Sequence, residues 1–395
     1  MESKKIILIS LFFYEKKDNI RISTVYKLLK ERGMDVELIT TDFKHRHKIK
    51  HTNLTSDPDI TYLPVPTYNS NISLGRLFSH LIFAWRLYKY LNRLTYIPAK
   101  LYCVVPTVSS GLACHYFCKK KHIPFIIDIV DLWPESFIIL SKQKKLLTLL
   151  TYPWQLMARK VYRSADKIFT GSIDYAEVAG QYNTKTKPVP IYLGVDRDRF
   201  NQSMAQSTLK IDKTDGHIWI CYGGVLENSY DFETILQCFK RLIDEGFDNL
   251  KLIFIGDGQE NKMISDYKEK FKLPIEITGY LAYADYLNYL SYADIAMNSF
   301  KEGTRVAYSY KFNDYISAGI PVLNNLKGET SELIIKHNIG LNFNYADSPL
   351  YDNISVLLTH PEVLAEMKKN CTFVAEHVLA TKFVYQEMMD EFMHQ

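Results

Sequence analysis

Short apolar runs rich in Val, Ile and Leu alternate with amphipathic stretches along nearly the whole chain. Apolar runs without polar alternation are typical of strands buried on both faces of a parallel sheet. The expected strands form two series: 5–11, 36–40, 101–106, 125–128, 167–170 and 190–193, and then 218–222, 250–255, 275–278, 294–298, 320–323 and 340–343. Because amphipathic helices such as 22–32, 231–245 and 259–271 lie between them, the pattern predicts an α/β protein with two Rossmann-like domains.

The break between the two series marks a domain boundary. A strand ends at Gly194, a charged turn leads to Phe200, and residues 201–216 are polar and without a strand pattern. Residues 361–395 have a helical apolar pattern. We therefore expect a first domain over residues 1–195 and a second that begins at residue 196.

The charge of the chain is divided unevenly. With 395 residues, of which 47% are hydrophobic, the protein is expected to be globular with more than one core. Residues 1–195 carry 29 Lys and Arg against 15 Asp and Glu, a net charge of +14. Residues 196–395 carry 19 against 29, a net charge of −10. Only the first half is therefore expected to meet an extended anionic surface.

Cysteine spacing and hydropathy indicate a cytoplasmic protein. The six cysteines are scattered without a CxxC pair, so neither a disulfide framework nor a zinc site is expected. No apolar run approaches the roughly 18 to 20 residues of a transmembrane helix. Residues 6–14 lack a small-residue cleavage site after the apolar run and are interpreted as a buried first strand, not a signal peptide.

Residues 299–323, SFKEGTRVAYSYKFNDYISAGIPVL, contain the strongest candidate site. A turn-prone loop with Glu302, Gly303 and Thr304 precedes a helix start that carries Lys311 and Asp314. Main-chain N–H groups at such a position favour an anion, and a carboxylate one turn into the helix can accept hydrogen bonds from ribose hydroxyls. We interpret the segment as a nucleotide-diphosphate site. An ordinary helix-to-strand unit with a surface aspartate is the alternative, and the spacing alone does not separate the two.

Four motifs together resemble a known family. They are DIVDLWPES at 128–136, IYLGVDRDRF at 191–200, YGGVLENSYDFETIL at 222–236 and KFNDYISAGIPVL at 311–323. In this order they resemble elements of the GT-B-fold retaining glycosyltransferases of family four, of the bacterial surface-polysaccharide type. The resemblance implies two Rossmann-like domains that face each other across a cleft. It places the acceptor on residues 1–195, the donor on residues 196–372, and a C-terminal helix, 373–395, packing back on the first domain.

The resemblance also implies roles for individual residues. Asp314 would bind the ribose hydroxyls. Gly223 and Gly224 would let the main chain approach the pyrophosphate, and Gly279 and Tyr280 would flank the base. The loop of Glu302, Gly303 and Thr304 would complete the donor site.

Several positions depart from the family pattern, among them Val306, which stands eight residues before Asp314 where many members have a glutamate, and Glu15–Ile20, where a glycine pair is usual. The Arg and Lys that usually follow the first donor-domain strand are missing between Gly223 and Tyr230, so Lys311 and Arg305 are the nearest cations that could offset the leaving diphosphate. Asp131 would lie near the donor sugar, where many relatives carry a histidine. Its alternative role is a helix N-cap, which the following Pro134 favours.

The function implied is that of a hexosyl- or N-acetylhexosaminyl-type glycosyltransferase that needs neither a metal nor a cofactor. It would move a sugar from a nucleotide diphosphate sugar, most often UDP-linked, to a polyprenyl-pyrophosphate-linked glycan in capsule or other polysaccharide biosynthesis. A UDP-sugar 2-epimerase of the same fold and a non-catalytic nucleotide-sugar or polysaccharide-binding subunit are the alternatives. The basic amphipathic stretches 73–94 and 142–167 predict contact with an anionic membrane surface at its inner face, and no nucleic-acid partner is expected.

Overall fold

The computed structural model describes residues 4–13, 20–45, 47–51, 57–70, 73–135, 138, 143–214, 216–304, 306, 308–344 and 349–393. The chain divides into two compact units, which are Met1–Tyr192 with Tyr385–Gln395, and Leu193–Val384. The first boundary lies three residues before the one expected from the sequence. The second lies twelve residues after the expected one, because helix α15 (Pro361–His377) belongs entirely to the second unit.

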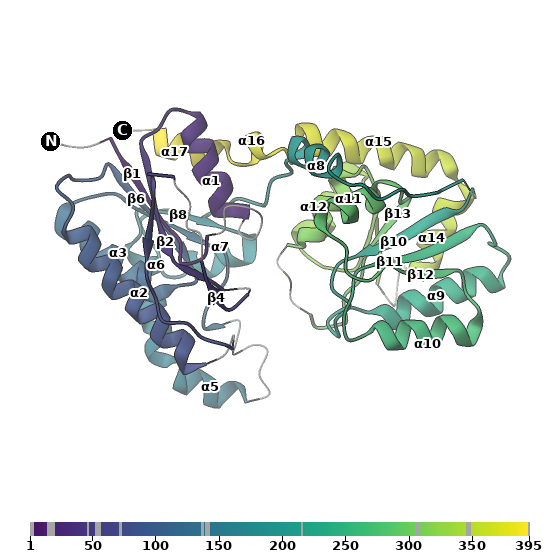
Figure 1. The fold of residues 1–395 in the computed structure, drawn as a ribbon, viewed down its shortest axis with the longest axis horizontal. Coiled ribbons are helices and arrows are strands. Elements are labelled where there is room, and N and C mark those ends of the chain that lie inside the picture. The colour runs from purple at the N-terminus through teal and green to yellow at the C-terminus, as the bar shows by residue number, and fades with distance from the viewer. Residues whose placement is uncertain are drawn as a thin grey trace. The chain divides into compact units, whose positions relative to one another are not determined.

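A seven-stranded parallel sheet forms the core of the first unit (Figure 1). Its strands, in spatial order, are β5 (Ile60–Leu63), β2 (Val36–Thr41), β1 (Ile6–Ile9), β6 (Lys100–Val105), β7 (Phe125–Ile129), β8 (Lys167–Thr170) and β9 (Val189–Pro190). Every residue of β1, β2, β6 and β7 is buried, as the unbroken apolar runs predicted. The sequence pattern did not predict β5 or the short antiparallel pair β3 (Phe43–Lys44) and β4 (Ile49–Lys50).

Helices cover this first sheet. They are α1 (Ile20–Glu31), α2 (Leu74–Asn92), α3 (Val108–Lys121), α5 (Lys144–Leu150), α6 (Tyr152–Ser164) and α7 (Ile173–Gly180). Of these, α3 packs against both α2 and α6. The C-terminal helix α17 (Gln386–Met393) also belongs to this unit, and the Phe392 ring lies 5.5 Å from the Tyr102 ring. The chain thus returns to the first unit at Tyr385, whereas residues 373–384 of the expected C-terminal helix belong to the second unit.

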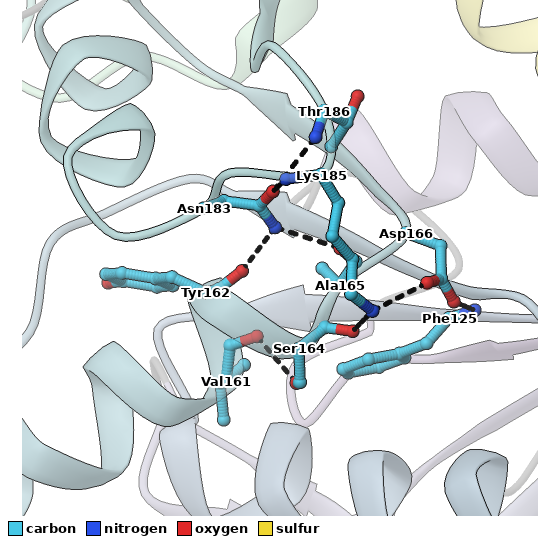
Figure 2. Close-up of polar contacts among 9 residues, drawn as sticks. All are labelled: Phe125, Val161, Tyr162, Ser164, Ala165, Asp166, Asn183, Lys185 and Thr186. Atoms are coloured by element: carbon cyan, nitrogen blue, oxygen red, sulfur yellow. Dashed lines mark hydrogen bonds and ion pairs between the residues drawn. The ribbon is translucent and has the colours of Figure 1, made fainter.

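The amide of Asn183 ties the end of α6 to the segment between α7 and β9 (Figure 2). Its Nδ2 donates to the carbonyl oxygens of Tyr162 (2.7 Å) and Ala165 (2.9 Å), which lie at the end of α6. Its Oδ1 accepts from the main-chain N–H groups of Lys185 (2.8 Å) and Thr186 (3.0 Å). The last carbonyl groups of a helix have no hydrogen-bond partner within the helix. The buried Asn183 amide supplies donors for two such carbonyls and also accepts from two main-chain N–H groups of the following segment.

A buried ion pair lies at the centre of the first unit. Asp128, which begins the DIVDLWPES motif, accepts from Arg21 Nε at 2.5 Å and Nη2 at 2.7 Å, and also from the hydroxyl of Tyr102. Arg21 further donates to the carbonyl oxygen of Ile191, which lies next to the boundary between the two units at Tyr192. The Asp128 carboxylate raises the pKa of Arg21 against the opposing effect of burial, so this pair is a fixed structural charge pair.

The second unit has a six-stranded parallel sheet. Its spatial order is β12 (Ile275–Ile277), β11 (Leu250–Ile255), β10 (Ile218–Gly223), β13 (Ile295–Asn298), β14 (Val322–Asn324) and β15 (Gly340–Asn342). The helices are α8 (Arg197–Met204), α9 (Phe232–Asp244), α10 (Asn261–Phe271), α11 (Tyr283–Ser291), α12 (Tyr310–Ser317), α13 (Glu329–His337), α14 (Leu350–Thr359), α15 and α16 (Thr381–Val384). Numbered by their order in the chain, the strands of this sheet lie in the spatial order 3-2-1-4-5-6, and those of the first sheet lie in the order 3-2-1-4-5-6-7 when the pair β3 and β4 is left out. Both units are therefore Rossmann-like, and the predicted fold class is confirmed. No helix among the described residues is long and apolar enough to cross a membrane.

Candidate functional site

Gly223, Gly224 and the loop of Glu302, Gly303 and Thr304 follow the carboxyl ends of β10 and β13, whereas Gly279 and Tyr280 follow β12. The strand order reverses between β10 and β13, and ligands of open α/β sheets bind in the crevice that such a reversal creates. The loops that follow the strands contact each other. Lys301 N donates to Ser229 O at 3.0 Å, and the rings of Tyr230 and Phe300 are 4.9 Å apart.

Gly223 and Gly224, at the end of β10, make room for two side chains. A Cβ at Gly223 would lie 2.6 Å from a ring carbon of Tyr286, and one at Gly224 would lie 2.5 Å from Lys311 Cε. Gly224 also has a φ of +133°, which only glycine adopts readily. The N–H of Gly223 donates to Tyr315 Oη (3.0 Å) and that of Gly224 to a main-chain carbonyl. Both donors are thus engaged inside the protein, and here the glycines serve to admit Tyr286 and Lys311.

Lys311, on the first turn of α12, is surrounded by aromatic rings. Its Nζ lies 3.6 Å from the ring centroid of Tyr230, 5.0 Å from that of Tyr222 and 5.3 Å from that of Phe300. Among the described residues, no carboxylate lies within ion-pair distance of this ammonium group. Burial lowers the pKa of Lys311 to about 7, and the charge of Glu227 partly opposes the shift. A bound anion would favour the charged form of this amine, and the surrounding π faces do not neutralise that charge.

Asp314 lies one turn after Lys311 and is half-buried. Its Oδ1 accepts a hydrogen bond from Tyr283 Oη at 3.0 Å. Burial raises the pKa of Asp314 to about 6, although hydrogen bonds from Tyr283 and Tyr286 and the charge of Arg199 all act in the opposite direction. A carboxylate that is partly shielded from solvent at the carboxyl ends of the strands is suited to accept hydrogen bonds from hydroxyl groups.

The other predicted donor residues lie in exposed turns. Glu302 and Gly303 are exposed, and Thr304 Oγ1 donates to Ser229 O at 3.4 Å, which joins this loop to the one after β10. Tyr280, which follows β12 at the edge of the sheet, exposes 80% of its surface, and Gly279 before it has a φ of +71°. Both turns follow the carboxyl ends of parallel strands. Arg305 lies outside the described residues.

Asp131 belongs to the first unit, where it follows β7. Its Oδ1 accepts from the N–H of Leu132 at 2.8 Å and its Oδ2 from Trp133 Nε1 at 2.6 Å. The Trp133 ring in turn stacks parallel to His80 at 6.1 Å and receives the guanidinium of Arg76 at 4.3 Å. The carboxylate therefore organises the local loop as well as being a candidate for catalysis.

The sequence did not point to the tyrosines that create these environments. Tyr283 and Tyr286 are three residues apart and so share one face of α11, where they cover Asp314. Tyr222 and Tyr230 flank Lys311. The sequence contains 28 tyrosines, and the spacing of those near the predicted site is the sequence feature that could have indicated their role.

Comparisons with known proteins show what this fold resembles. No family model and no curated protein matches the sequence. Among solved structures, sucrose-phosphate synthase of Thermosynechococcus elongatus superposes with a TM-score of 0.71 at 15% identity, covering 99% of this chain and 98% of that one. Anabaena HepE in complex with UDP gives 0.67 at 12%, covering 99% and 100%, and WaaG, a glycosyltransferase involved in lipopolysaccharide biosynthesis, gives 0.63 at 11%, covering 99% and 100%. The chain thus shares the two-domain fold of these glycosyltransferases over its whole length.

Proposed function

We propose that this protein is a retaining glycosyltransferase that transfers a sugar from a UDP-sugar to a lipid-linked glycan acceptor in polysaccharide biosynthesis. The second unit would hold the nucleotide and the first unit the acceptor. The fold it shares with HepE, which was solved with UDP and with UDP-glucose, supports a nucleotide-sugar donor. A hexose or N-acetylhexosamine is the sugar class that the sequence motifs favour.

One observation carries the proposal: the pairing of Lys311 and Asp314 on α12 at the carboxyl edge of the second sheet. The spacing of one helical turn suits two adjacent parts of a nucleotide. Asp314 would accept hydrogen bonds from the ribose hydroxyls, and Lys311 would face the diphosphate. The aromatic surroundings of Lys311 leave its charge without a carboxylate partner among the described residues, as an anion site requires.

In the proposed reaction, the bond between the anomeric carbon and the diphosphate oxygen breaks while a bond to the acceptor hydroxyl oxygen forms. Negative charge develops on the departing UDP, and Lys311 would stabilise it, so the proposal needs no metal ion. The hydroxyl proton passes to the departing phosphate oxygen. Holding both substrates in position can supply up to about 7–11 kcal/mol of the barrier.

Binding and turnover test the proposal separately. Titration calorimetry of UDP should show 1:1 binding that Asp314→Asn weakens about 10- to 100-fold, since hydrogen bonds to a charged group contribute about 1.5–3 kcal/mol. Asp266→Asn, an exposed position on α10, is the matched control. Incubation with a panel of UDP-sugars and a polyprenyl-pyrophosphate glycan should release UDP and add one sugar mass to the acceptor, with chelator present. Equal UDP affinity in both variants would refute the donor site, whereas binding without turnover would indicate a non-catalytic subunit.

A further inference from the structure

Three asparagines lie side by side at the carboxyl ends of adjacent strands of the second sheet. Asn298 ends β13, Asn324 ends β14 and Asn342 ends β15, and the register pairs Asn298 with Asn324 and Asn324 with Asn342. Asparagine is depleted in strands, and Asn298 and Asn324 are almost completely buried. Buried amide groups need hydrogen-bond partners, and the partners of these three show what they do.

The amides bond each other and the main chain. Nδ2 of Asn298 donates to Oδ1 of Asn324 at 2.8 Å, and Nδ2 of Asn324 donates to Oδ1 of Asn342 at 2.8 Å. Asn324 also bonds both main-chain polar groups of Leu326, and Asn342 donates to the carbonyl oxygen of Ser331 on α13. These donors and acceptors are used inside the protein, so the amides fix the segments that they join.

Asn298 holds the start of α12. Its Oδ1 accepts from Ser309 Oγ at 3.0 Å, and Ser309 is the buried residue that precedes this helix. A serine at this position usually accepts from an N–H group of its own helix, but none of the described N–H groups of α12 donates to this side chain. The hydroxyl group instead ties the first turn of α12 to the end of β13. Because Lys311 belongs to that turn, the contact fixes where its side chain begins.

A fourth asparagine holds a ring that flanks Lys311. Oδ1 of Asn325 accepts from the N–H of Phe300 at 2.8 Å, and its Nδ2 donates to the carbonyl oxygen of Phe300 at 2.8 Å. The amide therefore pairs with both main-chain polar groups of Phe300, as a neighbouring strand would. The main-chain N–H of Asn325 also donates to Asn298 O at 3.4 Å, which joins this contact to the other three asparagines.

The opposite side of Phe300 pairs with the loop after β10. Phe300 and Tyr230 form an antiparallel bridge, and main-chain hydrogen bonds of 3.0 and 3.3 Å join the residues on either side of them. The two residues are thus a non-hydrogen-bonded pair, in which side chains approach most closely. Their rings lie 4.9 Å apart, and the Nζ of Lys311 lies 3.6 Å from the Tyr230 centroid and 5.3 Å from the Phe300 centroid.

We propose that the asparagine network, Asn298, Asn324, Asn325 and Asn342, positions Lys311 for the diphosphate of the donor. Asn298 acts through Ser309 on the helix that carries Lys311, and Asn325 acts through Phe300 on the rings around the ammonium group. Apolar side chains at these strand ends would leave the main chain of Phe300 without these bonds, whereas a satisfied polar network specifies one arrangement. The inference rests on the proposed donor site and adds the residues that set its geometry.

Asn325→Ala tests the network, with UDP and uridine as probes. The variant loses both hydrogen bonds to Phe300, so UDP should bind about tenfold more weakly, the smallest loss expected when a hydrogen bond to a charged group is misplaced. Uridine lacks the diphosphate and should bind as it does to wild type. A merely structural defect would weaken both ligands by the same factor. Titration calorimetry measures UDP, and ligand-observed NMR measures uridine.

Asn288→Ala is the matched control. Asn288 is half-buried, as Asn325 is, and its Nδ2 donates two hydrogen bonds within the same unit, to Ser207 Oγ at 3.0 Å and to Leu209 O at 2.8 Å. This variant should lower the unfolding midpoint but leave the affinity for UDP unchanged. Ser309→Ala, which removes the contact between Asn298 and α12, should weaken UDP and spare uridine, and it decides the question if Asn325→Ala does not fold.

The amine of Lys311 provides a readout without a nucleotide. The rate of its acetylation at a series of pH values, followed by mass spectrometry, reports its pKa. Burial lowers this pKa to about 7, and release of the Phe300 ring in Asn325→Ala should admit water and raise it, whereas Asn288→Ala should leave it unchanged.

The outcomes separate this inference from the proposed function. Unchanged UDP affinity in Asn325→Ala, equal losses for UDP and uridine, or an unchanged pKa of Lys311 overturns the inference alone. Failure of the wild-type protein to bind UDP overturns the proposed donor site, and this inference with it.

Discussion

Replacing Asp314 by asparagine is expected to stabilise the free protein while weakening its binding of UDP. Burial raises the pKa of Asp314 from 3.8 to about 6. The difference between these two pKa values corresponds to about 3 kcal/mol, by which the ionised carboxylate opposes folding. We reduce this to about 1–3 kcal/mol because the side chain is partly exposed. Asparagine keeps an oxygen that can accept from Tyr283 Oη and carries no charge.

The pH dependence gives this prediction a clear sign. The folded-state pKa lies above the unfolded value. Stability therefore falls as the pH rises from the range in which the unfolded carboxyl group loses its proton to the range in which the folded one does. The cost is nearly complete above about pH 6 and disappears as the pH falls below the unfolded pKa of 3.8. The stability gained by Asp314→Asn should therefore be largest near pH 7–8 and vanish near about pH 3.

Guanidinium unfolding at these pH values, with calorimetry of UDP at neutral pH, provides the measurement. Asp266→Asn should change neither quantity, because this carboxylate is exposed on α10. If Asp314→Asn is less stable than wild type at pH 8, hydrogen bonding and not burial dominates the energetics of this carboxylate. If it is more stable but binds UDP normally, the carboxylate is buried for a structural reason and does not contact the nucleotide.

Three further predictions follow from other contacts. Lys311 has a pKa of about 7, so UDP binding at pH 8 should be accompanied by proton uptake, which calorimetry in buffers of different ionisation enthalpy measures. Lys311→Arg should abolish this uptake. Uptake that persists in the variant would show that another group takes up the proton. Gly223→Ala should cost about 1–3 kcal/mol in thermal unfolding because its Cβ would meet Tyr286 at 2.6 Å, whereas Gly180→Ala meets only an ordinary contact at 3.7 Å; equal costs would contradict this reasoning. Asn183→Ala should lower the free energy of unfolding by about 1–3 kcal/mol. Asn183→Asp keeps the two accepted hydrogen bonds and loses the two donated ones, so it should also be destabilised. A free energy of unfolding equal to that of wild type would show that the donated bonds do not contribute.

Local patterns in the chain were sufficient to predict the architecture. The unbroken apolar runs of β1, β6, β10 and β11 are strands that are almost wholly buried, and the alternation of strands with amphipathic helices predicted two parallel sheets. Strand β5 was missed because its residues are only partly buried and prolines follow it, so it shows no buried-strand signal. The spacing of Lys311 and Asp314 was also readable, since one helical turn places them on one face.

Tertiary structure alone decided the electrostatic character of the candidate site. Burial shifts the pKa values of both Asp314 and Lys311, and the side chains around them, which are tyrosines of α11 and rings that follow β10 and β13, come close only when the sheet assembles. The same holds for Arg21 and Asp128, which are 107 residues apart in the chain and form a buried pair. Periodicity records which face of an element avoids water, because burial acts on each residue along its own strand or helix. It does not record which distant side chain removes water from a given carboxylate or ammonium group, and that contact sets the chemistry.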